Sequence, residues 1–110
     1  MWKPDSSQII TAEQKQAEAL ESLTAFFSQA IQTHLDSRAQ ERRYDSIQTA
    51  VTYRDDPNTS FAAEGGALFA WRSAVWTYAL AELAKVQAGQ RDIPTTADFI
   101  AELPPLVWPA

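Results

Sequence analysis

Apolar residues recur at steps of three and four along the first half of the chain. The stripe consists of Leu20, Leu23, Phe27, Ala30 and His34, widened by Thr24, Ile31 and Leu35. This spacing places the side chains on one face of an α-helix. Thr11 and Gln14 have the spacing of a capping box, and neither Gly nor Pro occurs from there to Arg43. The pattern therefore predicts a helix from about residue 11 to residue 43, roughly 45 Å long.

A second helical pattern covers residues 61–87. Its apolar positions fill more than one stripe, so more than one face of this predicted helix must be buried. They are Phe61, Leu68, Phe69, Trp71, Val75, Trp76, Tyr78, Ala79, Leu80, Leu83 and Val86. Gly65-Gly66 lies in the early turns, where each glycine costs about 1 kcal/mol relative to alanine. Either the helix begins after the glycines, or another backbone passes close to them.

Two shorter helices are predicted by their start signals. Asp45 with Gln48 marks one of them, and Thr95 with Asp98 marks another over about residues 96–103. Other residues that commonly begin or end helices support the predicted boundaries. They are Asn58, Thr59 or Ser60 as a cap of the second long helix, Gly89 as its left-handed end, and Pro104-Pro105 as the end of the last helix.

The expected fold is all-α: a hairpin of two long helices with two short accessory helices and an extended C-terminal tail. A chain of 110 residues has the size of one domain. We expect an extended lead-in over residues 1–10, a helical domain over residues 11–103 and an extended apolar tail over residues 104–110. Trp2 and Ile9-Ile10 of the lead-in are candidates to dock on the domain. The tail either packs on its own domain or engages another chain.

Composition removes several classes of function. A net charge of −5 disfavours attraction to nucleic acid or to an anionic membrane. The absence of cysteine excludes disulfides, cysteine-ligated zinc and thiol catalysis, and fits a reducing cytoplasm. No apolar run approaches the roughly 18 residues of a membrane span, and the N-terminus lacks the apolar core of a signal peptide. We expect no nucleic-acid partner and no membrane.

The side chains that carry chemistry do not form a catalytic constellation. His34 is the only histidine, and we expect a partly buried ring hydrogen-bonded to a carboxylate or carbonyl, with pH sensing as the alternative. Asp55-Asp56 lacks the later residues of a calcium loop and is interpreted as loop capping. The one basic cluster is interleaved with acidic residues, so we expect a solvated or salt-bridged face. It consists of Arg38, Arg42 and Arg43. We expect no enzyme activity, no cofactor and no metal site.

The aromatic load is the most informative feature. A hairpin encloses little interior, yet the chain has four tryptophans, five phenylalanines and three tyrosines. Either the short helices and the tail cover these rings, or some remain available to a partner or a second copy. The candidate partner-binding residues are Trp71, Arg72, Trp76, Tyr78, Leu106 and Trp108. We expect Arg72 to stack on Trp76, and we expect the chain to form a homo-oligomer.

A set of residues between Arg43 and Pro109 occurs in an order that resembles a known family. The residues are Arg43-Tyr44-Asp45-Ser46-Ile47, Ala50, Tyr53, Phe61, Glu64, Ala67-Leu68, Trp71-Arg72, Val75-Trp76, Val86, Ala88-Gly89, Pro94-Thr95, Leu103-Pro104 and Trp108-Pro109. In this order the chain resembles a family of small proteins encoded in the tail-gene modules of bacteriophages and prophages, often near tail fibres and their assembly factors. The closing Trp-Pro is also similar to the ends of some tail assembly chaperones.

The resemblance implies a non-enzymatic role in tail assembly, and it brings no catalytic or binding residues. We expect a tail fibre or tail assembly chaperone whose partner is a phage tail or tail-fibre protein. Such a protein would act in the cytoplasm of the bacterial host, or remain in the virion tail. The alternatives are a structural component of the virion and a small phage regulator or inhibitor that binds a host protein.

Overall fold

The computed structural model describes residues 12–110, and within that range it contains four α-helices and no strand. The helices are α1 (Ala12–Gln40), α2 (Ile47–Val51), α3 (Thr59–Gln87) and α4 (Thr96–Glu102), with a 3-10 turn, η2 (Thr52–Asp55), after α2. The all-α prediction of two long and two short helices is confirmed. The expected lead-in over residues 1–10 and the expected cap Thr11 lie outside the described residues.

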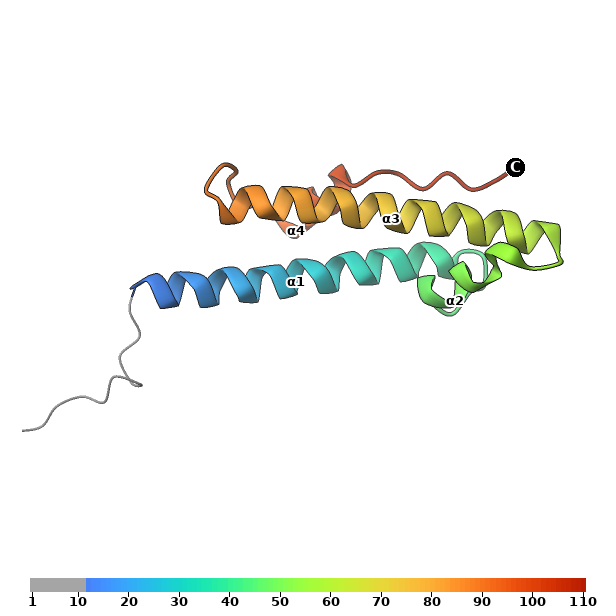
Figure 1. Cartoon of the computed structure of the whole chain (residues 1–110), viewed down its shortest axis with the longest axis horizontal. Helices are drawn as coiled ribbons and strands as arrows, with labels where there is room; N and C mark the ends of the chain where they lie inside the picture. Colours follow the sequence, from blue (N-terminus) through green and yellow to red (C-terminus); the bar gives the residue numbers. More distant parts are fainter. Residues whose placement is uncertain (1–11) are drawn as a thin grey trace, which may run out of the picture.

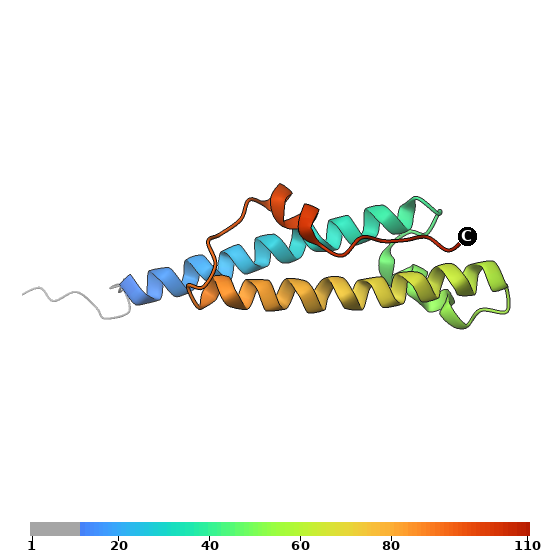
Figure 2. The ribbon, with the colours of Figure 1, turned by 90° about the horizontal axis from the view of Figure 1, so that it is seen from above.

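The two long helices form an antiparallel hairpin, and the other elements lie against it on two sides (Figure 1). α1 contributes Phe27, Ile31, Leu35 and Ala39 to the core at steps of four. α3 contributes Leu68, Trp71, Val75, Ala79 and Leu83 at steps of three and four. α2 with η2 lies on one side of the hairpin and α4 on the other, as the two views together show (Figure 2).

Both long helices end in the same hydrogen-bonded motif. At the end of α3, Gly89 has a φ of 73°, and Gln90 N donates to Lys85 O at 2.8 Å. The left-handed conformation predicted for Gly89 is confirmed. At the end of α1 the left-handed residue is Arg43, with a φ of 75°, and Tyr44 N donates to Ala39 O. The first helix therefore ends three residues before the predicted boundary.

The caps of the later helices follow the sequence signals with one correction. Asn58 Oδ1 accepts from the second and third backbone N–H groups after it, and Thr95 Oγ1 accepts from Asp98 N. The predicted cap Asp45 is wrong, because Ser46 has the extended backbone of a cap and its hydroxyl accepts from Thr49 N. Asp45 is exposed, one residue too early to reach that N–H.

Gly65 lies inside α3 because a second backbone passes against it. α3 begins at Thr59, before Gly65-Gly66, so the alternative of a helix that begins after the glycines is wrong. A Cβ on Gly65 would lie 2.6 Å from Arg54 N and 2.8 Å from the carbonyl carbon of Tyr53. The close approach of η2 to α3 therefore requires glycine at this position. Gly66 has open space around it and carries no such requirement.

The C-terminal tail packs on its own domain. Figures 1 and 2 show it returning along the hairpin from α4 towards the end where α1 is joined to α3. Trp71 Nε1 donates to Pro104 O at 2.7 Å, and Leu106 and Trp108 pack against the core. Val107, between them, is 78% exposed. Of the two alternatives for the tail, the structure shows the first.

Candidate functional site

The six candidate partner-binding residues separate into two groups on α3 and the tail. Trp71 is buried, and the Tyr78 hydroxyl donates to Glu102 Oε1 at 3.0 Å, so both face α4 and the tail. Leu106 and Trp108 belong to that tail and are partly buried. The other two, Arg72 and Trp76, line a hollow with residues of α1 and α2, on the opposite side of α3.

Arg72 does not stack on Trp76, so that prediction is wrong. Three arginines of the described residues do lie over aromatic rings: Arg42 over Trp108 and Arg54 over Phe69, each at 4.7 Å, and Arg91 over Phe99 at 5.6 Å. Arg72 instead borders a hollow of about 400 Å³ with Gln32, Ile47, Gln48 and Trp76. Within residues 12–110 it has no ion pair or hydrogen bond through its side chain.

An aromatic and charged cluster closes the end of the hairpin at which α1 is joined to α3. We call it the closed-end cluster, and it consists of Arg42, Arg43, Tyr44, Tyr53, Phe61, Glu64 and Trp108. The rings of Tyr44 and Tyr53 are 5.5 Å apart, and those of Tyr53 and Phe61 are 5.6 Å apart. These distances are typical of favourable aromatic pairs. The three rings come from the α1–α2 turn, η2 and α3, so they hold these segments together.

Glu64 is the polar centre of the closed-end cluster. Its carboxylate accepts from Tyr44 Oη at 2.9 Å and from Arg42 Nη1 at 2.7 Å. Burial and the hydrogen bond to Glu64 raise the pKa of Tyr44 to about 12, so the phenol stays protonated and donates. Because Arg42 also lies over the Trp108 ring, the same carboxylate indirectly positions the tail.

Six of the seven members of the closed-end cluster also belong to the stretch that carries the family resemblance. They are Arg43, Tyr44, Tyr53, Phe61, Glu64 and Trp108. Sequence reasoning did not identify them as one site, because they span 66 positions and no helical period connects them. Their joint occurrence in the resemblance was the available signal. Part of the cluster faces outwards: Phe61 is 42% exposed, and Arg42, Arg43, Tyr44, Tyr53 and Phe61 border a hollow of about 220 Å³.

Two of the three arginines in the basic cluster at the end of α1 are salt-bridged, as expected. Arg38 pairs with Glu41 and Arg42 pairs with Glu64. Arg43 is exposed and makes no ion pair within the described residues. Loop capping is confirmed for Asp56, whose Oδ2 accepts from Asn58 N at 2.9 Å. Asp55 instead lies 4.0 Å from Arg54 Nε and caps no backbone N–H of the described residues.

His34 differs from its expected environment. Its ring is partly buried and packs against Trp71 in an edge-to-face arrangement, with 5.7 Å between ring centroids. It makes no side-chain hydrogen bond within residues 12–110. Burial lowers the pKa of His34, and the nearby Arg38 charge lowers it further. The ring is therefore neutral at pH 7.

A charged network attaches α4 to α3. Arg91 Nη1 lies 2.9 Å from Glu82 Oε2 and 2.6 Å from Glu102 Oε1. The Tyr78 hydroxyl donates to the same Glu102 carboxylate. The hydrogen bond from Arg91 holds the pKa of Glu102 below its ordinary value, and those from Lys85 and Arg91 do so for Glu82. This network fixes the side of the hairpin opposite to Arg72 and Trp76.

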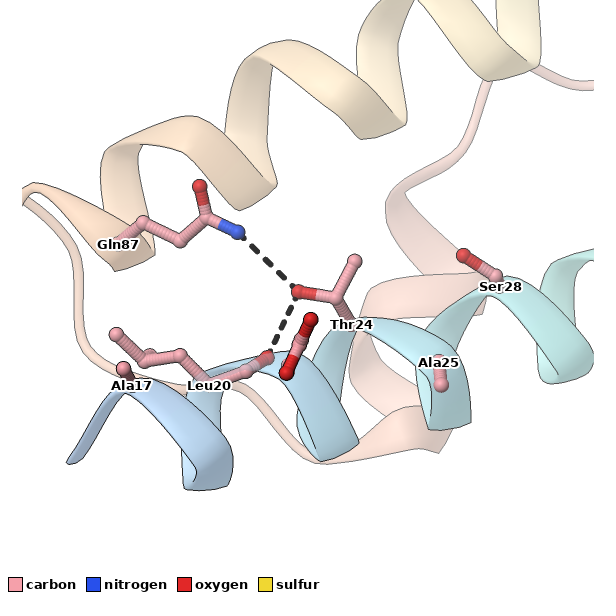
Figure 3. A pocket seen from close by; sticks show the side chains of 7 residues that line it. Ala17, Leu20, Thr24, Ala25, Ser28 and Gln87 are labelled. Atoms are coloured by element: carbon pink, nitrogen blue, oxygen red, sulfur yellow. Dashed lines mark hydrogen bonds between the residues drawn. The ribbon is translucent and has the colours of Figure 1, made fainter. Parts of the chain in front are cut away.

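An open hollow lies between the start of α1 and the end of α3 (Figure 3). Its volume is about 520 Å³, and mostly small or apolar side chains line it: Ala17, Leu20, Glu21, Thr24, Ala25, Ser28 and Gln87. Thr24 Oγ1 accepts from Gln87 Nε2 at 3.2 Å and donates to Leu20 O at 2.9 Å. The hydrogen bond between Gln87 and Thr24 links α3 to α1 beside the hollow, and the hollow stays open to solvent.

Several large apolar side chains remain exposed in the described residues. They are Phe26, Phe61, Phe69, Leu80, Ile93 and Val107. In residues 12–110 no group of three or more His, Asp or Glu side chains is placed to hold a metal ion. The helices of the same range are each too short or too polar to cross a membrane. Comparison with known protein families, with curated proteins and with solved structures gave no match to this chain.

Proposed function

We propose that this chain is a non-enzymatic phage tail-associated protein, a chaperone that assists assembly of the tail or its fibre by binding another polypeptide. The observation that carries the proposal is that six residues of the resembling stretch lie together in the closed-end cluster. Residues that are scattered along the sequence meet at one end of the hairpin, and they leave Phe61 and Arg43 facing outwards. A surface of aromatic and arginine side chains is typical of the energetic centre of a protein interface.

The internal bonds of the closed-end cluster support this role. Glu64 holds Tyr44 and Arg42, and Tyr53 contacts both Tyr44 and Phe61. The aromatic surface is thus ordered before any partner arrives, which reduces the entropy lost on binding. Trp108 shares the arrangement through Arg42.

The experiment is co-expression of the chain with the tail-fibre protein of the same phage, followed by pull-down and measurement of soluble fibre. We expect co-purification and a higher yield of soluble fibre. Phe61→Asp should weaken the complex at least about tenfold, because it places a charge at the centre of the apolar surface. Phe26→Asp is the matched control, since Phe26 is 60% exposed on α1 and lies outside the closed-end cluster. Failure to bind, together with an unchanged fibre yield, would refute the proposal.

A structural role in the virion is the second candidate, because a role in building the tail, which the resemblance implies, is open to a component of the particle as well as to a chaperone. A chaperone acts in the host cytoplasm and leaves the finished particle, whereas a structural component stays in the tail. Mass spectrometry of purified virions separates the two. We expect the chain to be absent from the particles.

A further inference from the structure

Arg43 is the one residue other than glycine with a positive φ among residues 12–110. Its φ of 75° is close to the 73° of Gly89, which follows α3 in the same hydrogen-bonded motif. Glycine is the usual residue at this position, because a Cβ in the left-handed conformation lies too close to the following carbonyl oxygen. The end of α1 therefore combines a strained backbone with a long cationic side chain, whereas the end of α3 has neither.

The Arg43 side chain makes no compensating contact inside the described part of the chain. The neighbouring Arg42 pairs with Glu64 and lies over the Trp108 ring. Arg43, in contrast, is exposed, and within residues 12–110 it has neither an ion pair nor an aromatic ring beneath its guanidinium group. The guanidinium is therefore available to a group outside this chain.

The hollow beside Arg43 has room for one large apolar side chain. The side chains of Tyr44, Tyr53 and Phe61 line it, and Arg42 and Arg43 border it. Its volume is about 220 Å³, and about 150 Å³ is enough for a benzene ring. The Tyr53 hydroxyl makes no hydrogen bond within the described residues, so it can bond to the backbone of an incoming segment.

One positive charge at this hollow is uncompensated. Glu64 balances the charge of Arg42, with 2.7 Å between Oε2 and Nη1. The nearest acidic residue along the chain after Arg43 is Asp45, which is exposed and does not border the hollow. The whole chain has a net charge of −5, so it repels acidic polypeptides in general. The hollow instead attracts a carboxylate at one place, which favours one orientation of an incoming segment.

We infer that the partner segment recognised by the closed-end cluster carries an Asp or Glu beside a large apolar residue. The apolar side chain enters the hollow between the rings, and the carboxylate pairs with Arg43, whose planar guanidinium can bond to both carboxylate oxygens. This inference rests on the proposed polypeptide-binding function and names the chemistry that its binding surface recognises. Arg43 is then the residue that determines specificity, because the rings accept any large apolar group and the guanidinium selects acidic segments.

Substitution of Arg43 separates a role in binding from a role in the fold. Arg43→Gly removes the backbone strain and the charge together, so stability and binding should change in opposite directions. We expect a higher urea midpoint, but binding of the fibre protein at least about tenfold weaker, because a charged hydrogen bond to the partner is lost. Arg43→Lys keeps the charge and should lose less affinity than Arg43→Gly.

Lys15→Gln is the charge control for these variants. Lys15 is exposed near the start of α1, and it has no ion pair within residues 12–110. We expect this variant to bind the fibre protein as the parent chain does. If Arg43→Gly also binds as tightly as the parent chain, the inference is overturned.

A displayed library of random peptides tests the recognised chemistry without the fibre protein. Peptides are selected on the parent chain and counter-selected on Phe61→Asp, whose helices are checked by circular dichroism. We expect the selected peptides to carry Asp or Glu beside a large apolar residue, and their binding to weaken as salt is added. Peptides without acidic residues, or no selected peptides at all, overturn the inference.

A double-mutant cycle identifies the pair that carries the charge contact. Replacing the acidic residue of a selected peptide with its amide should weaken binding to the parent chain about as much as Arg43→Gly does. The two changes together should cost no more affinity than either alone, because they remove the same ion pair. Independent effects of the two changes would show that the carboxylate does not pair with Arg43. If the selected peptides behave as expected but the fibre protein does not bind, the proposed partner is wrong and the recognition chemistry stands.

Discussion

The indole N–H of Trp71 on α3 donates a 2.7 Å hydrogen bond to the carbonyl oxygen of Pro104, the first residue of the C-terminal tail. On α1, the His34 ring packs against the same indole in an edge-to-face arrangement. One buried side chain therefore connects both long helices and the tail. The tail is held from its start by the core, and again near its end where Arg42 lies over Trp108.

Trp71→Phe removes the hydrogen-bond donor and keeps most of the buried ring. We expect the free energy of unfolding to fall by about 2 kcal/mol, from the lost bond and the space left by the smaller ring. Cleavage of the tail by a protease should become faster, because Pro104 loses its anchor. Trp76→Phe is the control, since Trp76 is only partly buried and has no such bond. Equal tail cleavage in both variants would contradict this role of Trp71.

The neighbouring glycines of α3 should respond to alanine with opposite signs. Gly65→Ala places a methyl group 2.6 Å from the backbone nitrogen of Arg54, and neither helix can yield without breaking hydrogen bonds. We expect a loss of more than about 2 kcal/mol in urea unfolding. Gly66→Ala has nothing within 4 Å and should stabilise α3 by about 1 kcal/mol. A stabilising Gly65→Ala would show that η2 does not lie against α3.

Substitutions of the left-handed residues that follow α1 and α3 should also have opposite effects on stability. Arg43 has a φ of 75° and no ion pair within residues 12–110, so Arg43→Gly removes backbone strain without breaking a bond of the side chain. We expect a gain of about 1 kcal/mol in thermal or urea unfolding. Gly89→Ala introduces the same strain at a φ of 73° and should cost about as much. A destabilising Arg43→Gly would mean that its side chain contributes a stabilising contact.

Local features of the fold were predictable because their causes are local. The capping of α4 by Thr95 and the left-handed Gly89 depend on residues within one turn, and both are confirmed. The cap of α2 was misplaced by one residue, since Asp45 and Ser46 are both good capping residues and the backbone of the turn decides between them.

The candidate site was not predictable in the same way, because it depends on tertiary contacts. Helical spacing puts Arg72 and Trp76 on one face but does not determine whether the guanidinium lies over the ring or reaches towards α2. Trp71 and Trp76 also look alike in sequence, but Trp71 is buried against His34 and the start of the tail, whereas Trp76 borders an open hollow. Pairing of Glu64 with Arg42 joins residues 22 positions apart, beyond any local rule.

The network around Arg91 predicts how stability depends on pH. Arg91 holds the pKa of Glu102 below 4.5, its ordinary value, so the folded chain binds the proton of this carboxyl group more weakly than the unfolded chain does. The stabilisation is therefore complete above about pH 4.5 and is lost as the pH falls through the folded-state pKa. Urea midpoints should drop between pH 5 and pH 3. Glu102→Gln, which lacks the charge, should have a flatter profile, whereas the control Glu18→Gln, exposed on α1, should follow the parent chain. Parallel profiles for the parent chain and Glu102→Gln would show that other carboxylates control the acid response.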